Sequence, residues 1–300
     1  MRYVVTGGAG FIGSAIAKLL VKNNHEVVIV DNLHTGDLFR LKEIKDSVIF
    51  HQIDIRKKTE LEDIIKNSDG VFHEAGLTSV VESFKKPKEY YDVNVNGTKN
   101  IFEICQNFEK KVVFASSSSV YGDVEEIPIS ENFDRNPINL YAETKVKNEN
   151  MVTSFFKDNS QIIGLRYFNV YGKGQTGTYA GVITQFLKRL GKKLPPIIHG
   201  TGSQIRDFIF VNDVAEANIL IMNSNTNSGF FNIGSGKPTS ILDLANMMIK
   251  ISSLNLQPEF DNNLPGDIEN SLADISLTEK TFGWKSNSNL YDQLKNLMSL

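Results

Sequence analysis

Residues 3–13 read Tyr3-Val4-Val5-Thr6-Gly7-Gly8-Ala9-Gly10-Phe11-Ile12-Gly13, an apolar strand-like run followed by a glycine-rich turn and the start of a helix. The spacing Gly7-x-x-Gly10-x-x-Gly13 permits a tight turn, a close approach of the backbone to a pyrophosphate and close packing of the helix on the strand. The free N–H groups of a helix N-terminus bind such a phosphate. The stretch therefore predicts a dinucleotide-binding turn.

An acidic residue stands where the next strand-like run ends. Asp31 follows the run 27–30 and lies 18 residues after Gly13, where a carboxylate accepts hydrogen bonds from the ribose hydroxyls of a dinucleotide. The same carboxylate would repel a 2′-phosphate, and residues 32–36 contain no Arg or Lys, so the sequence favours NAD over NADP. Asp54, after the run 48–53, is expected at the adenine edge, with capping of the next helix as the alternative.

Strand-like and helical segments alternate through the first half of the chain. Apolar runs occur at 3–5, 27–30, 48–53, 71–73, 112–115 and 162–165, with helical segments at 11–22, 59–67, 87–108 and 139–157. This alternation is typical of a parallel sheet covered by helices on both faces. We therefore predict an α/β fold, a Rossmann-type doubly wound parallel sheet, in an NAD-binding domain over residues 1–168. Residues 169–300, with helical patterns near 179–190 and 240–252, are expected to form mainly a smaller C-terminal α/β lobe, and 230–233 is a candidate to rejoin the first sheet.

Length and composition exclude several classes of function. The 300 residues are 41% hydrophobic and 22% charged, with a formal net charge of −3, as in an ordinary globular protein. The chain has no apolar run of membrane-spanning length and no basic surplus, so we expect neither membrane nor nucleic-acid binding. A single cysteine, Cys105, leaves no internal disulfide and no thiolate metal site, and we expect it in the core and expect no metal. These features, and an N-terminus without a charged leader, favour a cytoplasmic setting.

Tyr141 and Lys145 are four residues apart on a predicted helix, so they share one helix face. A free phenol has a pKa of about 10 and is a poor base at neutral pH. A neighbouring ammonium lowers that pKa, which makes the pair a candidate general base for taking a proton from an alcohol. The same spacing also occurs on solvated helix faces. The serine run Ser116–Ser119, the glycine turn and Asp31 favour the catalytic interpretation.

Motifs along nearly the whole chain resemble the extended short-chain dehydrogenase/reductase family. Within it, the chain is similar to the nucleotide-sugar 4-epimerases of the UDP-glucose and UDP-N-acetylglucosamine type. The motifs that carry this resemblance are Thr6–Gly13, Asp31-Asn32, Asn94–Thr98, Ser116–Gly122, Tyr141-x-x-x-Lys145, Arg166–Gly172, Arg206-Asp207-Phe208 and Pro265-Gly266-Asp267. The resemblance implies redox-neutral epimerisation at C4 of a UDP-hexose through a 4-keto intermediate, with tightly bound NAD. It also implies a homodimer through the helices near 87–108 and 139–157.

The resemblance assigns a role to each matching residue. Tyr141 is the acid/base, Lys145 bonds the nicotinamide ribose and lowers the tyrosine pKa, and Ser117 bonds the sugar 4-hydroxyl, with Ser118 as a close competitor. The residues expected to bind NAD are Gly7, Gly10, Phe11, Ile12, Gly13, Asp31, Asn32, Asp54, Ile55, Ala75, Asn94, Tyr141 and Lys145. The residues expected to bind the nucleotide sugar are Ser79, Ser117, Ser118, Asn169, Val182, His199, Arg206, Asp267 and Ser271.

Neighbouring chemistries of the family differ at identifiable positions. The 4,6-dehydratases carry an Asp-Glu pair where this chain has Ser118 and Ser119, and elimination of water needs such an acid and base. The UDP-glucuronate decarboxylases usually carry a glutamate at the place of Ser119. The alternatives that stay open are a nucleotide-sugar dehydrogenase or reductase and another nucleotide-sugar epimerase of the family. A non-catalytic NAD-sensing scaffold is a further alternative, against which the intact Ser117, Tyr141 and Lys145 argue.

The chain departs from the family pattern in the sugar-binding part. Leu264 replaces the arginine of the usual Arg-x-Gly-Asp motif, so either Arg206 and a lysine such as Lys173 bind the diphosphate, or the diphosphate is held less tightly. Ser271 stands at the position that selects the sugar 2-substituent. Its small side chain, like the segment 177–183, favours acceptance of N-acetyl sugars as well as UDP-glucose, with ordinary loop packing as the alternative.

Four more positions complete the expectations. His199 stands where relatives often carry an aromatic side chain near the uracil, with a loop histidine without a role as the alternative. Glu74 and Gly76 stand where relatives often carry Leu and Ala. Trp284 is expected to pack the smaller lobe.

Overall fold

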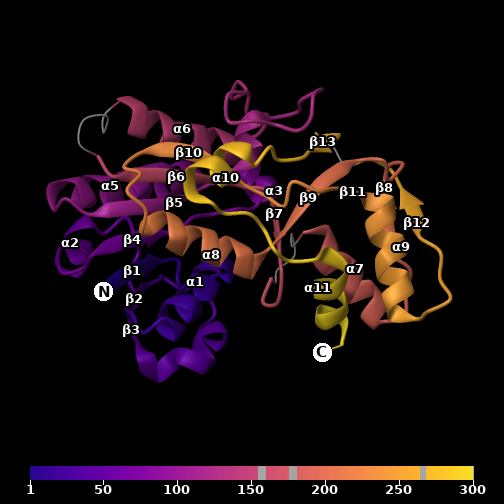
Figure 1. The fold of residues 1–300 in the computed structure, drawn as a ribbon, viewed down its shortest axis with the longest axis horizontal. Coiled ribbons are helices and arrows are strands. Elements are labelled where there is room, and N and C mark those ends of the chain that lie inside the picture. Colours follow the sequence, from indigo (N-terminus) through magenta and orange to yellow (C-terminus); the bar gives the residue numbers. More distant parts are fainter. Residues whose placement is uncertain (155–159, 176–180, 264–267, 300) are drawn as a thin grey trace.

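The computed structural model describes residues 1–154, 160–175, 181–263 and 268–299, and its main layer is a seven-stranded sheet (Figure 1). Every neighbouring pair of strands in this sheet is parallel. In sheet order the strands are β10 (Gly229–Ile233), β6 (Ile162–Tyr167), β5 (Lys111–Ser117), β4 (Gly70–His73), β1 (Arg2–Thr6), β2 (Glu26–Val30) and β3 (Val48–His51). The predicted fold class is confirmed, and so is the return of 230–233 to this sheet.

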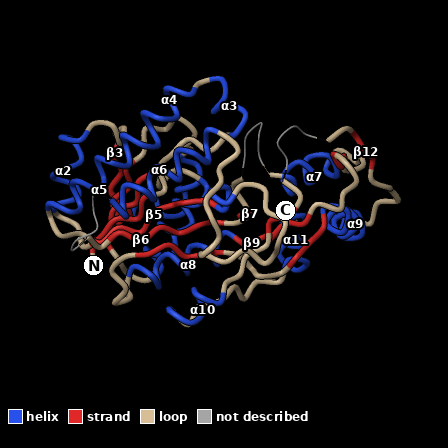
Figure 2. The backbone as a smooth tube through the Cα atoms, turned by 90° about the horizontal axis from the view of Figure 1, so that it is seen from above, coloured by secondary structure: helices blue, strands red, loops and turns tan. Residues whose placement is uncertain are grey.

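Helices cover both faces of the sheet, as Figure 2 shows from above. One face packs against α2 (Lys58–Lys66), α5 (Thr98–Asn107) and α6 (Leu140–Ser154). The other packs against α1 (Phe11–Lys22) and α8 (Val211–Met222). Successive strand residues such as Val4 and Val5 are buried in opposite cores. The strands are therefore apolar on both faces, as a covered parallel sheet requires.

The helix α8 is not among the predicted helices. Its exposed residues Asn212, Glu216 and Leu220 form one narrow stripe, and the rest of the helix is buried. The exposed stripe contains an apolar leucine, and the buried part contains the polar Asp213 and Asn218. The sequence therefore shows no clean division into an apolar and a polar face.

The smaller lobe has its own sheets and core. Its strands are β7 (Asn169–Tyr171), β8 (Ile197–His199), β9 (Ile205–Phe210), β11 (Pro238–Ser240), β12 (Glu259–Asp261) and β13 (Asn270–Ser271). Its helices are α7 (Val182–Gly191), α9 (Ile241–Ser252) and α11 (Leu290–Met298). Phe186, Leu244 and Met248 belong to a core that is separate from the two cores of the main sheet. The exact domain boundary at residue 168 stays a prediction, because β10 and α8 come from beyond it.

Trp284 does not pack the smaller lobe as expected. It joins the core between the main sheet and the helices α1 and α8. The segment after α10 (Ser276–Phe282) is held there because Ser286 and Ser288 donate to the carboxylate of Asp213 on α8. The remaining helical segments are η1 (Leu38–Ser47), α3 (Val80–Lys85), α4 (Pro87–Tyr91), η2 (Asp92–Gly97) and η3 (Ser118–Tyr121). Within the described ranges, no helix combines the length and the apolar character needed to cross a bilayer.

Candidate active site

The glycine turn joins β1 to α1 at the carboxyl edge of the main sheet. Gly7 has a φ of +66°, and its N–H donates to Val30 O at 2.8 Å. A Cβ at Gly7 would lie 2.7 Å from Ala75 N, and a Cβ at Gly13 would overlap the Gly7 carbonyl. No side chain caps α1, a helix described in full, so its first N–H groups are available to a phosphate. The turn therefore fits the pyrophosphate of a dinucleotide.

Asp31 folds back over this turn. Its carboxylate accepts from Ala9 N at 3.0 Å and from Leu33 N at 2.8 Å. Burial raises the pKa of Asp31, while these two hydrogen bonds and the charge of Arg40 act in the opposite direction. Asp31 thus stabilises the shape of the glycine turn, a role that the sequence did not indicate, and its predicted contact with the ribose stays a prediction.

Arg40, on η1, is another residue that the sequence analysis missed. Its guanidinium donates to Gly174 O at 3.1 Å and to Ala9 O at 3.3 Å. It therefore ties the glycine turn to the loop that follows β7. Nothing in the local sequence pattern marks this residue, because these two acceptors are backbone carbonyls from distant segments.

The predicted adenine edge is built from Asn32 and Asp54. Asn32 Nδ2 donates to Asp54 Oδ2 at 2.9 Å, and Arg56 donates to the same carboxylate at 2.8 and 2.9 Å. The Arg56 hydrogen bond is the main reason why the pKa of Asp54 is well below its usual range. The N-cap of α2 is Lys57, so Asp54 does not cap that helix. The neighbouring Ile55 is buried.

Asn94 lies on a π-helical turn, η2, between α4 and α5. Its side chain accepts from Leu77 N at 2.7 Å, donates to Leu77 O at 2.9 Å and donates to Thr144 Oγ1 at 3.1 Å. Single π-turns inside helices are frequent at functional sites. Here the turn interrupts the helix predicted over 87–108 and directs Asn94 between the loop after β4 and α6.

The catalytic candidates lie at the carboxyl end of β5 and on the facing side of α6. Ser117 ends β5, and its hydroxyl lies near enough to the Tyr141 phenol to lower the pKa of that phenol. Lys145 Nζ donates to Ala115 O at 2.7 Å and lies 5.8 Å from the centroid of the Tyr141 ring. The backbone N–H and the hydroxyl of Ser119 both donate to Ser117 Oγ, at 3.2 and 2.9 Å. The structure thus brings Ser117, Tyr141 and Lys145 together, and it favours Ser117 over Ser118 as the partner of Tyr141.

The expected lowering of the tyrosine pKa is not what this arrangement produces. Burial raises the pKa of Tyr141 and the charge of Glu74 raises it further, while only the Ser117 hydrogen bond lowers it. Burial also lowers the pKa of Lys145 to about 8, against the charges of Glu74 and Glu149. Lys145 is not among the groups that shift the pKa of Tyr141 here, since its ammonium donates to a backbone carbonyl, and its predicted lowering of that pKa stays a prediction.

A buried ion pair fixes α6 against the sheet below the catalytic candidates. Glu149 accepts from Arg166 at 2.7 and 2.9 Å and from Ser116 Oγ at 2.6 Å. Arg166 also donates to Tyr121 Oη at 2.8 Å. Breaking such a buried pair by removing one partner costs about 3–5 kcal/mol. The network therefore holds the serine run and α6 in one register.

The residues predicted to bind the sugar are more widely spread. Asn169 on β7 donates to Asp207 O at 3.2 Å, and Arg206 on β9 donates to Ile205 O at 2.9 Å. Ser271 on β13 is buried and is paired in register with Arg206. The placements of the other described candidates are Ser79 at the N-cap of α3, Val182 at the start of α7 and His199 at the end of β8. Leu264, Asp267 and residues 177–180 lie outside the described residues.

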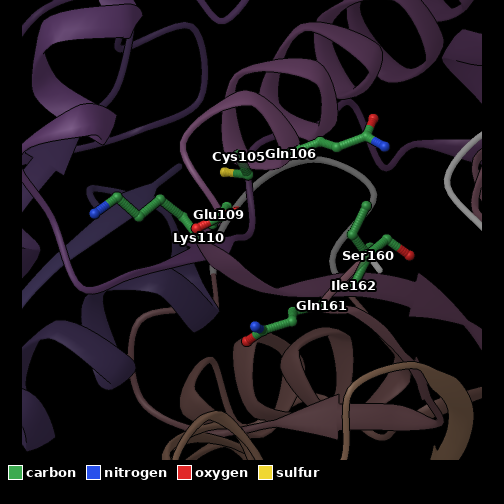
Figure 3. A pocket seen from close by; sticks show the side chains of 7 residues that line it. All are labelled: Cys105, Gln106, Glu109, Lys110, Ser160, Gln161 and Ile162. Carbon is green, nitrogen blue, oxygen red and sulfur yellow. The ribbon is translucent and has the colours of Figure 1, made fainter. Parts of the chain in front are cut away.

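A small cavity at the opposite edge of the main sheet is not part of this site. Its lining, shown in Figure 3, includes Cys105, Lys110 and Gln161. Lys110 and Gln161 directly precede the parallel strands β5 and β6, so the cavity lies at their amino ends. Cys105 is buried in the core as predicted. Among the described residues, no cluster of His, Cys, Asp and Glu is arranged to hold a metal ion.

Comparisons with known proteins agree with this geometry. Residues 3–234 match the NAD dependent epimerase/dehydratase family. The chain is 36% identical to a putative UDP-glucose 4-epimerase of Methanocaldococcus jannaschii over 99% of this chain and 97% of that protein. It is also 36% identical to a UDP-N-acetyl-alpha-D-glucosaminuronate decarboxylase of Bacillus cytotoxicus, over 81% of this chain and 78% of that protein.

A solved structure extends the likeness to three dimensions. UDP-N-acetylglucosamine 4-epimerase from Methanobrevibacter ruminantium, in complex with UDP-N-acetylmuramic acid, superposes with a TM-score of 0.94 and 34% identity, over 99% of this chain and 97% of that one. Both the sequence and the fold therefore match over nearly the whole chain. The chain belongs to the NAD dependent epimerase/dehydratase family, and its cofactor is NAD.

Proposed function

We propose that the protein is an NAD-dependent UDP-sugar 4-epimerase that interconverts UDP-glucose with UDP-galactose, and also the corresponding N-acetylhexosamine pair, through a 4-keto sugar. The observation that carries this proposal is the grouping of Ser117, Tyr141 and Lys145 at the carboxyl edge of the sheet that also bears the glycine turn. The relatives named as UDP-sugar 4-epimerases support it.

In this mechanism Tyr141 takes the proton from the sugar O4 and later returns it. Ser117, whose hydroxyl lies near the phenol, orients the 4-hydroxyl toward it. Lys145, with a pKa of about 8, is mostly charged at neutral pH and stabilises the phenolate as it forms. Bound NAD supplies the acceptor, and then the donor, of the hydride at C4. Because no net oxidation results, the same residues serve both directions.

Inversion requires that the keto sugar present its opposite face before the hydride returns. The protein must therefore bind the substrate mainly through the nucleotide diphosphate, away from C4. Arg206 and Asn169, on neighbouring strands of the smaller lobe, are our candidates for this contact. An arginine suits a diphosphate through its charge and its forked geometry.

The residues around Ser117 distinguish epimerisation from decarboxylation, which the Bacillus cytotoxicus relative is named for. The Ser119 hydroxyl donates a hydrogen bond to Ser117 Oγ at 2.9 Å. A serine in this place supplies no carboxylate beside the sugar. The arrangement therefore supports chemistry at C4 alone.

The homodimer remains part of the proposal. Val81, Phe84 and Tyr91 are exposed on α3 and α4, beside α6 (Figure 2). Large apolar side chains exposed on neighbouring helices are compatible with a protein interface. Size-exclusion chromatography with light scattering measures the predicted dimer directly.

The deciding experiment incubates the protein with a panel of UDP- and dTDP-sugars and follows C4 by NMR. We expect interconversion of the glucose and galactose forms of UDP-sugars, and of their N-acetyl forms, without net change in absorbance at the NADH wavelength. A stoichiometric change in that absorbance would show a dehydrogenase or reductase instead. Epimerisation of UDP-glucose alone would contradict the N-acetyl part of the proposal.

A further inference from the structure

Glu74 is a carboxylate at the catalytic edge that the mechanism above does not use. It follows β4 in the middle of the main sheet, and its backbone N–H donates to Thr6 O at 3.1 Å. A Cβ on Gly7 would lie 2.8 Å from the Glu74 carbonyl carbon, so the residue packs directly on the glycine turn. Two residues later, a Cβ on Gly76 would lie 3.8 Å from Lys145 Nζ. The segment from Glu74 to Gly76 therefore runs between the glycine turn and the lysine of α6.

The hydrogen bonds around Glu74 end on its carboxylate. Asn218 Nδ2, on α8, donates to Val214 O and to Tyr167 Oη, both at 2.8 Å. The Tyr167 hydroxyl lies 2.9 Å from Glu74 Oε1 and 3.1 Å from Asn218 Oδ1. Because a carboxyl accepts a hydrogen bond in either protonation state, Tyr167 holds the Glu74 side chain in place whether or not it is ionised.

The charges that face Glu74 come mainly from α6. Lys145 lowers the pKa of Glu74, but burial is the larger effect and raises it to about 7. Tyr141 and Tyr167 have raised pKa values and stay neutral below pH 9. His73, on the same strand, has a pKa of about 3 because it is buried, so it is also neutral.

The other elements that pack against this carboxylate add no charge. Asn218 is its neighbour on α8, and residues 7–13 of the glycine turn contain no ionisable side chain. Lys145 and Glu74 are therefore the two groups here that titrate near neutral pH.

We propose that Glu74 is a positioning residue that places a negative charge at the nicotinamide end of the site, and so favours oxidised NAD, whose ring is cationic, over reduced NAD, whose ring is neutral. The inference rests on the proposed function in one respect, since it takes Lys145 to mark the nicotinamide end. Transfer of a hydride from C4 removes one positive charge from the ring, and the return of the hydride restores it. A fixed carboxylate therefore favours the return step, and it shortens the time for which the keto sugar is exposed to loss.

The test measures which form of the dinucleotide the protein keeps. Purified protein is equilibrated with equal concentrations of NAD⁺ and NADH, separated from free dinucleotide by rapid gel filtration, and denatured, and the released dinucleotides are quantified by chromatography. Glu74→Gln keeps an acceptor for Tyr167 but removes the charge. At pH 8 we expect the bound ratio of oxidised to reduced form to fall about tenfold in this variant, since an opposite charge nearby shifts such equilibria by one to three powers of ten.

A matched control removes a different carboxylate. Glu131 is a glutamate whose Oε1 accepts from Asn232 N at 2.7 Å, away from the dinucleotide turn. Glu131→Gln is expected to leave the bound ratio within twofold of the wild type.

The pH dependence of the bound ratio tests the charge of Glu74. In the wild type, the preference for oxidised NAD should grow between pH 6 and pH 8 as the carboxylate loses its proton. Lys145 titrates in both proteins, so the difference between wild type and Glu74→Gln reports the carboxylate together with its effect on the pKa of Lys145. A difference that does not change with pH contradicts the proposal.

A second variant keeps the test decisive if Glu74→Gln does not fold. Glu74→Asp retains the charge and gives up the bond from Tyr167, so it should keep the oxidised preference within about threefold. An aspartate variant with no preference, or a glutamine variant with an unchanged ratio at pH 8, overturns the inference. The proposed function fails in a different measurement. If it is wrong, Tyr141→Phe leaves sugar turnover intact, whatever the ratio of bound dinucleotides.

Discussion

The carboxyl edge of the main sheet and the smaller lobe differ in how their predicted ligand-binding residues are held. At the sheet edge the residues predicted to bind NAD or to act in catalysis bond to one another or to nearby backbone: Asp31 to Ala9, Asn94 to Leu77, Ser117 to Ser119. In the lobe, Asn169 donates to the backbone of Asp207, and Arg206 donates to the backbone of Ile205 and Glu269. We therefore expect the core of the main sheet to position the catalytic residues, and the separate core of the lobe to position those that choose the sugar. Each of these two regions can be altered separately.

The largest expected effect removes the acid/base from the sheet edge. Tyr141→Phe should lower sugar turnover by about a thousandfold, because a positioned acid/base contributes about 10²–10⁴ in rate. Bound NAD should be unchanged. Turnover is followed by NMR at C4, and Tyr91→Phe, an exposed tyrosine on α4, is the matched control. Turnover within a few-fold of the wild type would remove Tyr141 from the mechanism.

The next effect concerns the glycine turn itself. Gly13→Ala drives a methyl group into the Gly7 carbonyl, and overpacking of this kind costs about 1–3 kcal/mol. We expect NAD to be lost on purification and the melting temperature to fall. Gly191→Ala, at the end of α7 with no atom within 4 Å of the new Cβ, should change neither quantity. If Gly13→Ala retained a full complement of NAD, the turn would not be the pyrophosphate site.

A change confined to the lobe should alter substrate choice alone. Ser271→Tyr fills the space predicted for the 2-substituent, and should lower kcat/KM for UDP-N-acetylglucosamine about tenfold, within the range that pocket shape achieves. The value for UDP-glucose should stay within threefold, and NAD content should be unchanged. Ser203→Tyr, at an exposed serine of the same lobe, is the control. Equal losses on both sugars would mean that Ser271 supports the lobe and does not select the sugar.

The smallest effect comes from His73, in the core below the sheet edge. Burial lowers the pKa of His73 to about 3 in the folded state, whereas the pKa in the unfolded state is about 6.5. Between these two values the unfolded state binds a proton that the folded state does not bind. The unfolding free energy therefore falls as pH drops below about 6.5, by up to about 2 kcal/mol at pH 5. Denaturant titrations at pH 7 and pH 5 measure this loss. It should be smaller in His73→Gln than in the wild type, and an equal loss in both would assign the effect to other groups.

Local patterns predicted most of the sheet and the dinucleotide turn. The glycine spacing, the apolar strands and the position of Asp31 are each visible within a short stretch of sequence. A local pattern was therefore enough to predict them. Helix α8 was missed because its buried part includes Asp213 and Asn218 while its exposed stripe includes Leu220, so polar and apolar positions do not separate. Trp284 was misplaced because Ser286 and Ser288 anchor its segment to α8.

Site features that depend on distant partners were beyond the sequence. Glu74 meets Tyr167 across 93 residues and Arg40 meets Gly174 across 134. No spacing rule connects such pairs. The raised pKa of Tyr141 was missed for the same reason, since it depends on burial and on Glu74 together. The sugar-binding residues came from resemblance alone, and their roles stay predictions.

The contact that Arg40 makes between the glycine turn and the loop after β7 has a consequence for the evolution of this protein. Its guanidinium donates to two main-chain carbonyls, those of Ala9 and Gly174. Substitutions in the two facing segments leave these acceptors in place as long as the backbone keeps its course. The contact between the glycine turn and the loop after β7 therefore depends more on the backbone and on the arginine than on the neighbouring side chains.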